Sequence, residues 1–316
     1  MLLRRGWWSH LADPLVLATN PRTRSLLLLH GIVVIFGFTG ILGKLITLPS
    51  EPLVFWRVSL GGLTTALFLA FRRKWQRWKA RDLLRASLVG CLVALHWVTF
   101  FAAIKASSVG LALTMMATAP MFVGFVEPVV FGRRLAMREL VIAVFVFVGI
   151  SLVFRAETDQ TTGILLGLTS ALLAAVFSTF NGVLVKRHEP VNLSAVELLA
   201  ASVVMFGWLG VRGQWDASLV PMSWLDWLWL LLLAVVATSF AFMVSIRVLK
   251  DLTPFESAMA INLEPIYAIV LASWLFEERF DQTFYAGAAL VIGAVFVDTW
   301  LRSRKHKTGT RPPGLP

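Results

Sequence analysis

An amide and a carboxylate stand near the middle of a long apolar stretch, residues 253–279, which is long enough to cross a bilayer as a helix. A carboxylate at that depth costs about 3 kcal/mol to insert, so it usually faces a cavity or a polar partner. Pro265 directly follows Glu264 and removes a backbone donor, which favours a break in the helix. Glu264 and Asn262 are therefore candidates for binding a ligand or a coupling proton. The alternative is a structural carboxylate that accepts hydrogen bonds from the helix end freed by Pro265.

Three further side chains could take part in this chemistry from other apolar stretches. His96 titrates in the physiological range, so it is a candidate relay with Glu264. The alternative is a hydrogen-bonded packing histidine beside Trp97. Trp97 could form a ligand wall with the phenylalanines that follow it, although aromatic residues at this spacing more often pack or face lipid. Arg57 lies several residues into its apolar stretch, where it could bind a ligand carboxylate or pair with Glu51.

Polar side chains near the ends of the apolar stretches could form gates. The candidates are an inner group, Glu127, Asn181, Glu197 and Arg247, and an outer group, Lys44 and Lys105, with Arg57 and Glu51 nearby. Salt bridges that form on one side of a membrane and break on the other would bias alternating access. The alternative is interfacial solvation of long side chains, which we favour for Glu256, a first-turn helix acid. Asn181 is also a candidate for ligand binding or coupling.

The composition excludes several classes of protein. Of 316 residues, 58% are hydrophobic and 15% are charged, whereas soluble domains carry about 25% charged residues. The net charge of +11 arises from basic residues between apolar stretches, which fits membrane topology better than nucleic-acid binding. The single cysteine, Cys91, excludes an intrachain disulfide and a cysteine-rich metal site. We expect no cofactor, no metal and no cleaved signal peptide.

Ten apolar stretches divide the chain, and a basic tail stands at each end. The predicted bounds of the stretches are 26–46, 53–71, 83–103, 109–131, 139–155, 163–186, 194–211, 226–249, 253–276 and 283–301. If the N-terminus is cytoplasmic, the basic clusters at 72–85 and 133–138 also lie in the cytoplasm, as the positive-inside rule requires. We therefore expect both tails, 1–25 and 302–316, on the cytoplasmic side.

A shift of 145 residues brings an earlier stretch into register with the one that contains Glu264. It aligns Lys105 with Lys250, Pro120 with Pro265, Phe131 with Phe276, and Arg134 with Arg279. Pro120 and Pro265 are therefore the two predicted helix breaks. Five spans per half is an odd number, so the second half enters the membrane from the opposite side. We predict an all-α polytopic membrane protein of ten helices, with inverted five-helix repeats at 26–155 and 156–301.

Several runs of residues are characteristic in combination. They are GFTGILGKLI in the first stretch, Phe55-Trp56-Arg57 in the second, HWVTFFAAIKASSVG across the third, AVFSTFNGVLVKR in the sixth and NLEPIYAIVLASWLFEE in the ninth. With them the chain resembles EamA-type members of the drug/metabolite transporter superfamily over roughly residues 26–301. The resemblance implies ten helices in two repeats around a central cavity that alternates its access. Members of such families carry amino acids, other metabolites, sugars or drugs, so the resemblance does not identify a substrate.

We expect a secondary-active transporter and not an enzyme. It is predicted to export small metabolites such as amino acids across a bacterial inner membrane, by alternating access around a midplane cavity. The chain has no HExxH, GxSxG or ATP-binding motif, which disfavours an intramembrane enzyme and a self-contained ATP-driven pump. The alternatives are an uptake permease of the same fold and a non-transporting scaffold. The expected partners are a small-molecule substrate, membrane lipid and coupling protons, without nucleic acid; the oligomeric state is not predicted.

Overall fold

All regular elements are helical in the part of the chain that the computed structural model describes, residues 21–132, 134–135, 137–221 and 223–307. Most of the predicted N-terminal tail (1–20) and the last residues of the C-terminal tail (308–316) lie outside the described residues. The elements are α1 (Pro21–Leu45), α2 (Ser50–Phe71), α3 (Ala80–Ala106), α4 (Val109–Met116), α5 (Ala119–Phe131), α6 (Met137–Ala156), η3 (Thr158–Gln160), α7 (Thr161–Leu184), α8 (Pro190–Val211), η4 (Ala217–Leu219), α9 (Trp224–Leu231), η5 (Leu232–Phe240), α10 (Ala241–Val248), α11 (Pro254–Ile261), α12 (Glu264–Leu275) and α13 (Gln282–Lys307).

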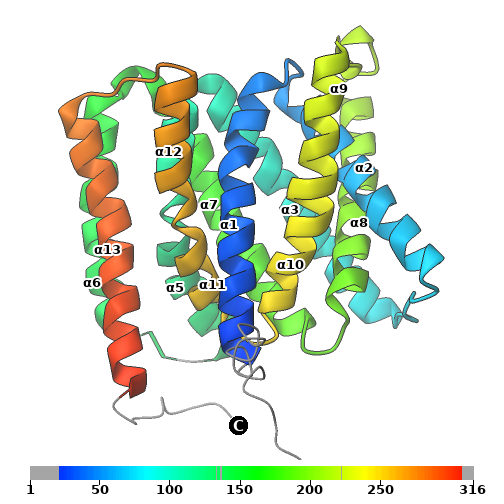
Figure 1. The fold of residues 1–316 in the computed structure, drawn as a ribbon, viewed down its shortest axis with the longest axis horizontal. Coiled ribbons are helices and arrows are strands. Elements are labelled where there is room, and N and C mark those ends of the chain that lie inside the picture. Colours follow the sequence, from blue (N-terminus) through cyan, green and yellow to red (C-terminus); the bar gives the residue numbers. More distant parts are fainter. Residues whose placement is uncertain (1–20, 133, 136, 222, 308–316) are drawn as a thin grey trace, which may run out of the picture.

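Ten apolar spans lie within the described residues, so the predicted fold class is confirmed. Eight are long and apolar enough to cross a membrane, and two shorter apolar stretches, Val141–Ala156 and Gln282–Ala294, lie in α6 and α13. The spans match the predicted stretches to within a few residues, except that α1 begins at Pro21 and α13 continues to Lys307. The start of α1 and the end of α13 lie at the same end of the bundle, as an even number of spans requires (Figure 1).

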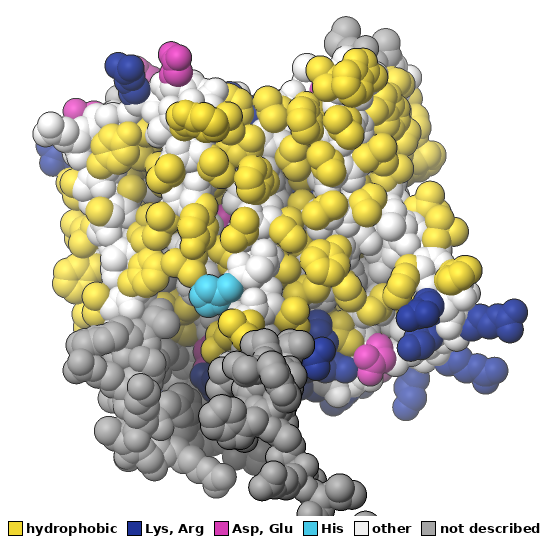
Figure 2. All heavy atoms as spheres, in the orientation of Figure 1, with side chains coloured by type: hydrophobic (Ala, Val, Ile, Leu, Met, Phe, Trp, Pro, Cys, Tyr) yellow, Lys and Arg dark blue, Asp and Glu magenta, His cyan; other side chains and the backbone are white. Residues whose placement is uncertain are grey.

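The outer surface of the bundle is apolar over its middle. Figure 2 shows hydrophobic side chains across the central band, while Lys and Arg side chains gather mainly toward the lower end of the visible face. Large apolar side chains are strongly exposed, including Phe71 (87%), Val129 (83%) and Trp274 (78%). Such a surface would be costly in water and is suited to lipid chains.

The two halves of the chain pack as an inverted repeat. Counterpart helices contact each other across the bundle: α2 packs against α8, α6 packs against α13, and the pair α4–α5 packs against the pair α11–α12. In addition, the third span of each half packs against the first span of the other half: α3 packs against α7, and α10 packs against α1. This pattern is expected when five-helix halves are related by a two-fold axis in the membrane plane. A central interface between the halves follows directly from it.

Two spans are interrupted where the halves meet. One breaks between α4 and α5, and Pro120 stands in the first turn of α5. The other breaks between α11 and α12, and Pro265 stands in the first turn of α12. The side-chain amide of Asn262 donates a hydrogen bond to the carbonyl of Ala117 at 2.8 Å. These two residues are separated by the same 145 positions as the prolines, so the bond joins equivalent points of the repeats. It also satisfies a backbone carbonyl at the break.

The eighth span changes its helical geometry near its centre. It begins as α9, continues as the π-helical segment η5, and ends as α10. Within η5, the hydroxyl of Thr238 donates a hydrogen bond to the carbonyl of Leu233, five residues earlier, at 2.7 Å. The segment packs against α2. Widened π turns inside helices occur frequently at functional sites, and this one faces the helix that carries Arg57.

Candidate functional site

A cavity lies between the two halves beside the helix breaks. Its empty volume is about 1060 Å³, including open solvent at its mouth. The cavity lining includes all six side chains predicted to bind the ligand or the coupling ion: Arg57, His96, Trp97, Asn181, Asn262 and Glu264. Leu249 and Pro254 also line it, and they lie where α10 leads into α11. The cavity therefore extends from the breaks toward the end of the bundle at which α1 begins (Figure 1).

Arg57 is the most deeply buried cation of this cavity, with 1% of the residue exposed. Its Nε donates a hydrogen bond to the hydroxyl of Thr238 at 2.6 Å. The guanidinium carbon lies 4.0 Å from the ring centroid of Trp97 and 5.4 Å from that of Phe101. Its Nη1 has no hydrogen-bond partner among the described residues. A guanidinium held on one side and unpartnered on the other is suited to an anionic ligand.

The alternative partner predicted for Arg57 is wrong. Glu51 accepts a hydrogen bond from the indole nitrogen of Trp208 at 2.9 Å, at an exposed position. Arg57 instead lies on the opposite, interior side of α2, because its neighbours are the π-helical segment and α3. Arg57 and Glu51 therefore do not belong to one outer gate.

Glu264 begins α12 and faces the same cavity as Arg57. Among the described residues its carboxylate forms no hydrogen bond and no ion pair with Arg57 or any other side chain. The alternative role, accepting hydrogen bonds from the helix end freed by Pro265, is thus not formed in this conformation. Asn262, two residues earlier, is occupied by its bond to Ala117. Opposite charges on Arg57 and Glu264 that share a cavity without direct pairing can each attract a different group of a ligand.

His96 connects α3 to α7. Its Nδ1 lies 2.9 Å from the carbonyl of Ser170 and 2.8 Å from the hydroxyl of the same residue, which itself donates to the carbonyl of His96. The ring stacks near Phe100 and lies 5.2 Å from the ring of Phe177. Among the described residues no hydrogen bond joins His96 to Glu264. The packing role predicted as the alternative accounts for these contacts, and a direct relay does not.

Aromatic rings form much of the cavity wall. Trp97 and Phe100 line it, as do Phe177 and Phe242 from the second half. Trp97 makes an edge contact with Phe242 at 5.5 Å between centroids. Phe101, the third member of the predicted wall, is fully buried behind it. An apolar wall with a few convergent polar groups is typical of a small-molecule site.

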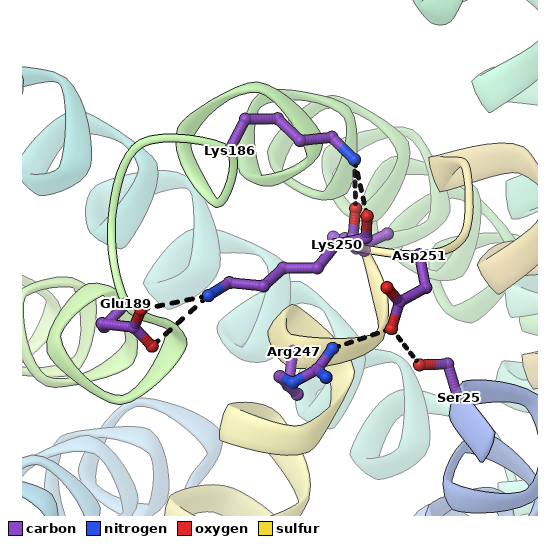
Figure 3. Close-up of polar contacts among 7 residues, drawn as sticks. Ser25, Lys186, Glu189, Arg247, Lys250 and Asp251 are labelled. Carbon is purple, nitrogen blue, oxygen red and sulfur yellow. Dashed lines mark hydrogen bonds and ion pairs between the residues drawn. The ribbon is translucent and has the colours of Figure 1, made fainter. Parts of the chain in front are cut away.

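A network of polar contacts links helices and loops at the end of the bundle where α1 begins (Figure 3). Asp251 lies between Ser25 of α1, whose hydroxyl donates at 2.6 Å, and Arg247, whose Nη1 donates at 2.9 Å. These contacts, the Ser25 bond first, hold the pKa of Asp251 below its ordinary value. Arg247 of the predicted inner gate thus contacts Asp251, and within the described part of the chain it forms no ion pair with Glu127 or Glu197.

Other contacts at this end tie the loops together. Lys250 reaches Glu189 at 3.2 Å, and Lys186 donates to the carbonyls of residues 249 and 250, as Figure 3 shows. Arg22 of α1 pairs with Glu256 of α11. Glu256 also forms a capping box with Thr253, as expected for a first-turn helix acid. The first half is thus fastened to the second by α1.

The opposite end of the bundle has a different set of polar contacts. The carboxylate of Glu278 accepts hydrogen bonds from the backbone amides of Val109 and Gly110, at the start of α4, at 3.1 and 3.0 Å. Lys44 lies 3.7 Å from Glu278. Lys105 donates to a backbone carbonyl just after α1. Lys44 and Lys105 therefore both lie at this end, as expected of the outer group, but they have separate partners.

The remaining inner candidates lie inside the bundle. Glu197 is 0% exposed, and its carboxylate accepts a hydrogen bond from the amide of Asn181 at 3.1 Å. Glu127 is 7% exposed, on α5. Within the part of the chain that the structure describes, no group of three His, Cys, Asp or Glu side chains could hold a metal ion.

Three side chains with important contacts were not among the predicted residues: Thr238, Asp251 and Glu278. Asp251 follows Arg247 by four positions, a spacing that is typical of ion pairs and could have identified it. Glu278 stands in the loop after α12, where nothing in the sequence indicates the helix start that it caps. Thr238 depends on the π turn, for which the apolar pattern gives no signal.

Comparison with known proteins agrees with this architecture. The model of the EamA-like transporter family matches residues 23–155 and 161–299. An uncharacterized transporter of Bacillus subtilis, YxxF, is 24% identical over 250 residues, covering 76% of this chain and 78% of the relative. An uncharacterized transporter of Archaeoglobus fulgidus is 23% identical over 199 residues, covering 63% and 70%. A crystal structure at 15% identity superposes with a TM-score of 0.67 over 92% of this chain and 99% of the other, which supports the fold alone.

Proposed function

This chain belongs to the EamA-like transporter family, and on that premise we propose that it is a secondary-active exporter of small carboxylate-bearing metabolites such as amino acids. The membrane-transporter function follows from the family and from its transporter relatives. The substrate class, the direction and the mechanism are the proposal. The observation that carries it is the buried guanidinium of Arg57 in the central cavity, with one nitrogen unpartnered.

The contacts of Arg57 support a carboxylate-bearing substrate. Thr238 and Trp97 fix the guanidinium from behind, and the planar fork of arginine matches a carboxylate with two parallel hydrogen bonds. Glu264 offers an opposite charge in the same cavity. An ammonium group of the substrate, or a proton when the substrate is absent, can neutralise it. The aromatic wall suits an apolar side chain.

Alternating access is supported by the inverted repeat and by a separate set of polar contacts at each end of the bundle. Inverted-repeat transporters move by rocking one half against the other around a fixed midplane site. Here the Asp251 and Glu256 contacts would hold one end, and the Glu278 contacts the other. Weakening one set while the other persists would expose the cavity to one side at a time.

Export from the cytoplasm is the direction that we propose. The cavity extends toward the end where α1 begins, and the basic loops that the positive-inside rule assigns to the cytoplasm favour that end as the inner one. Loading from the cytoplasm across a bacterial inner membrane, with both termini inside, is consistent with this geometry.

The test is an untargeted comparison of metabolites in cells and medium. Cells would express the wild type, Glu264→Gln, Glu51→Gln or an empty vector, with membrane levels of each protein matched. Glu51→Gln is the control, because that carboxylate contacts an exposed tryptophan away from the cavity. We expect a carboxylate-bearing compound to accumulate in the medium with the wild type and Glu51→Gln, and not with Glu264→Gln. Depletion of such a compound from the medium would indicate uptake instead of export. Identical metabolite profiles in all four cultures would contradict the proposal.

A further inference from the structure

A second acidic side chain is buried beside the cavity without lining it. Glu197 lies on α8 about 10 Å along the helix axis from its start at Pro190, and it is 0% exposed. Gly90 of α3 presses against its backbone: a Cβ at that glycine would stand 2.3 Å from the carbonyl oxygen of Glu197. The helices therefore pack so closely here that the carboxyl group is sealed from lipid and from bulk water.

The polar contacts of Glu197 do not neutralise a negative charge. Oε2 accepts one hydrogen bond, from the neutral amide of Asn181 at 3.1 Å, and Oε1 has no partner among the described residues. The hydroxyl of Ser194, one turn earlier on α8, is also fully buried and without a partner. An isolated carboxylate in such surroundings is strongly unfavourable, whereas the neutral acid carries a hydrogen that can serve as a donor.

The charged groups on the neighbouring helices are committed elsewhere. α8 packs against α2, α3 and α10, while Asn181 reaches it from α7. On these helices Arg57 is bound to Thr238, His96 to Ser170, and Arg247 to Asp251. Four others lie in the first half of α3: Arg81, which is exposed, Asp82 and Arg85, which pair with each other, and Cys91, which is partly buried. Two lie near the other helix ends, Glu51 bonded to Trp208 and Lys105 bonded to a backbone carbonyl. Glu197 forms no ion pair within the described part of the chain.

Asn181 connects this buried acid to the cavity. Its amide nitrogen donates to Glu197, it lines the cavity, and its Oδ1 has no hydrogen-bond partner among the described residues. We propose that Glu197 is a proton-binding site, separate from Glu264, which exchanges its proton with the cavity beside Asn181 and thereby couples transport to the proton gradient. This inference rests on the proposed transport function and adds a coupling site to it.

The proposed step is a simple proton transfer. In the conformation described, the carboxyl oxygen of Glu197 holds the proton. When the halves move and water reaches Asn181, the O–H bond breaks, the proton passes to cavity water, and the carboxylate keeps the amide of Asn181 as its donor. Rebinding from the other side of the membrane reverses the step.

The test measures the protonation state directly, by infrared spectroscopy of the purified full-length protein in liposomes across a pH series. We expect a carbonyl-stretch band of a protonated carboxyl group at neutral pH in the wild type and in Glu264→Gln, absent from Glu197→Gln. Asn181→Ala gives a second measurement that leaves the acid in place. Losing the donor should move that band to higher frequency without removing it. An unchanged spectrum in Glu197→Gln, or an ionised carboxylate whose band responds to sodium, would overturn the proposal.

Coupling is then tested in the same liposomes with the compound identified by the metabolite comparison. Glu197→Gln should still exchange that compound across the membrane. A pH gradient should accelerate its transport at least about tenfold less than it does with the wild type. Acceleration equal to that of the wild type would refute coupling through Glu197, even with the infrared band present. If the wild type moves no metabolite while the band is present, the proposed transport function fails instead, so the two failures are distinguishable.

Discussion

Thr238→Val removes the hydrogen bond that orients Arg57 while leaving the arginine in place. The substitution replaces a fully buried hydroxyl by a methyl group of similar size, so Nε of Arg57 loses its acceptor at 2.6 Å. The stacking of the guanidinium on Trp97 at 4.0 Å is untouched. A hydrogen bond to a charged group contributes about 1.5–3 kcal/mol. If most of this free energy is lost from substrate binding, the affinity for a carboxylate falls by about 10- to 150-fold.

The assay compares an acid with its neutral analogue. Binding of the carboxylate-bearing substrate and of its carboxamide would be measured on purified wild type, Thr238→Val and the control Thr169→Val. Thr169 donates only to a carbonyl of its own helix, at an exposed position. We expect Thr238→Val to weaken the acid by at least about tenfold and the amide by no more than about twofold. Equal losses for acid and amide, or an unchanged affinity for the acid in a folded variant, would refute a carboxylate-binding role for Arg57.

Three other predictions concern charge, packing and pH. Glu264→Gln should fold normally and lose gradient-driven flux in reconstituted vesicles; flux equal to the wild type would leave Glu264 without a role in coupling. Gly90→Ala should lower the melting temperature, because overpacking a helix contact costs about 1–3 kcal/mol, whereas Gly207→Ala, with open space around its Cβ, should not. Asp251 has a lowered pKa, so it stabilises the fold above its unfolded pKa of about 4 and loses this as pH falls through the folded value. Ser25→Ala should therefore make acid destabilisation begin at a higher pH, and melting curves that coincide with the wild type across the acid range would contradict this.

The positions of the spans could be predicted because the bilayer itself selects them. A run of apolar residues of bilayer length has few alternatives, so predicted bounds such as 109–131 agree with α4–α5. The central break is predictable for a similar reason. Pro120 and Pro265 each remove a backbone donor at membrane depth, which favours a break. At the break the carbonyl of Ala117 is left for a side chain, and it accepts the hydrogen bond from Asn262.

The partners of individual charges could not be predicted in this way. Glu51 and Arg57 lie six positions apart on α2, so helix geometry itself turns them to different faces. Their actual partners, Trp208 and Thr238, are 157 and 181 positions away in the sequence, and no local spacing indicates them. Thr238, the acceptor for Arg57, lies in the π-helical segment η5, which packs against α2, and the apolar pattern of the sequence gives no signal for that geometry. Hydropathy records how deeply a residue lies in the membrane, whereas the choice of neighbour depends on rotation of each helix about its axis.

Counterflow in reconstituted liposomes tests alternating access around the central cavity most directly. Vesicles containing the purified protein would be loaded with the unlabelled compound found in the metabolite comparison, and a trace of labelled compound would be added outside. We expect labelled compound to accumulate transiently above its equilibrium level in wild-type vesicles, because a site open to one side at a time exchanges its occupants. In vesicles with Arg57→Gln this accumulation should be lost. A monotonic approach to equilibrium with the wild type would indicate a passive pore and contradict alternating access.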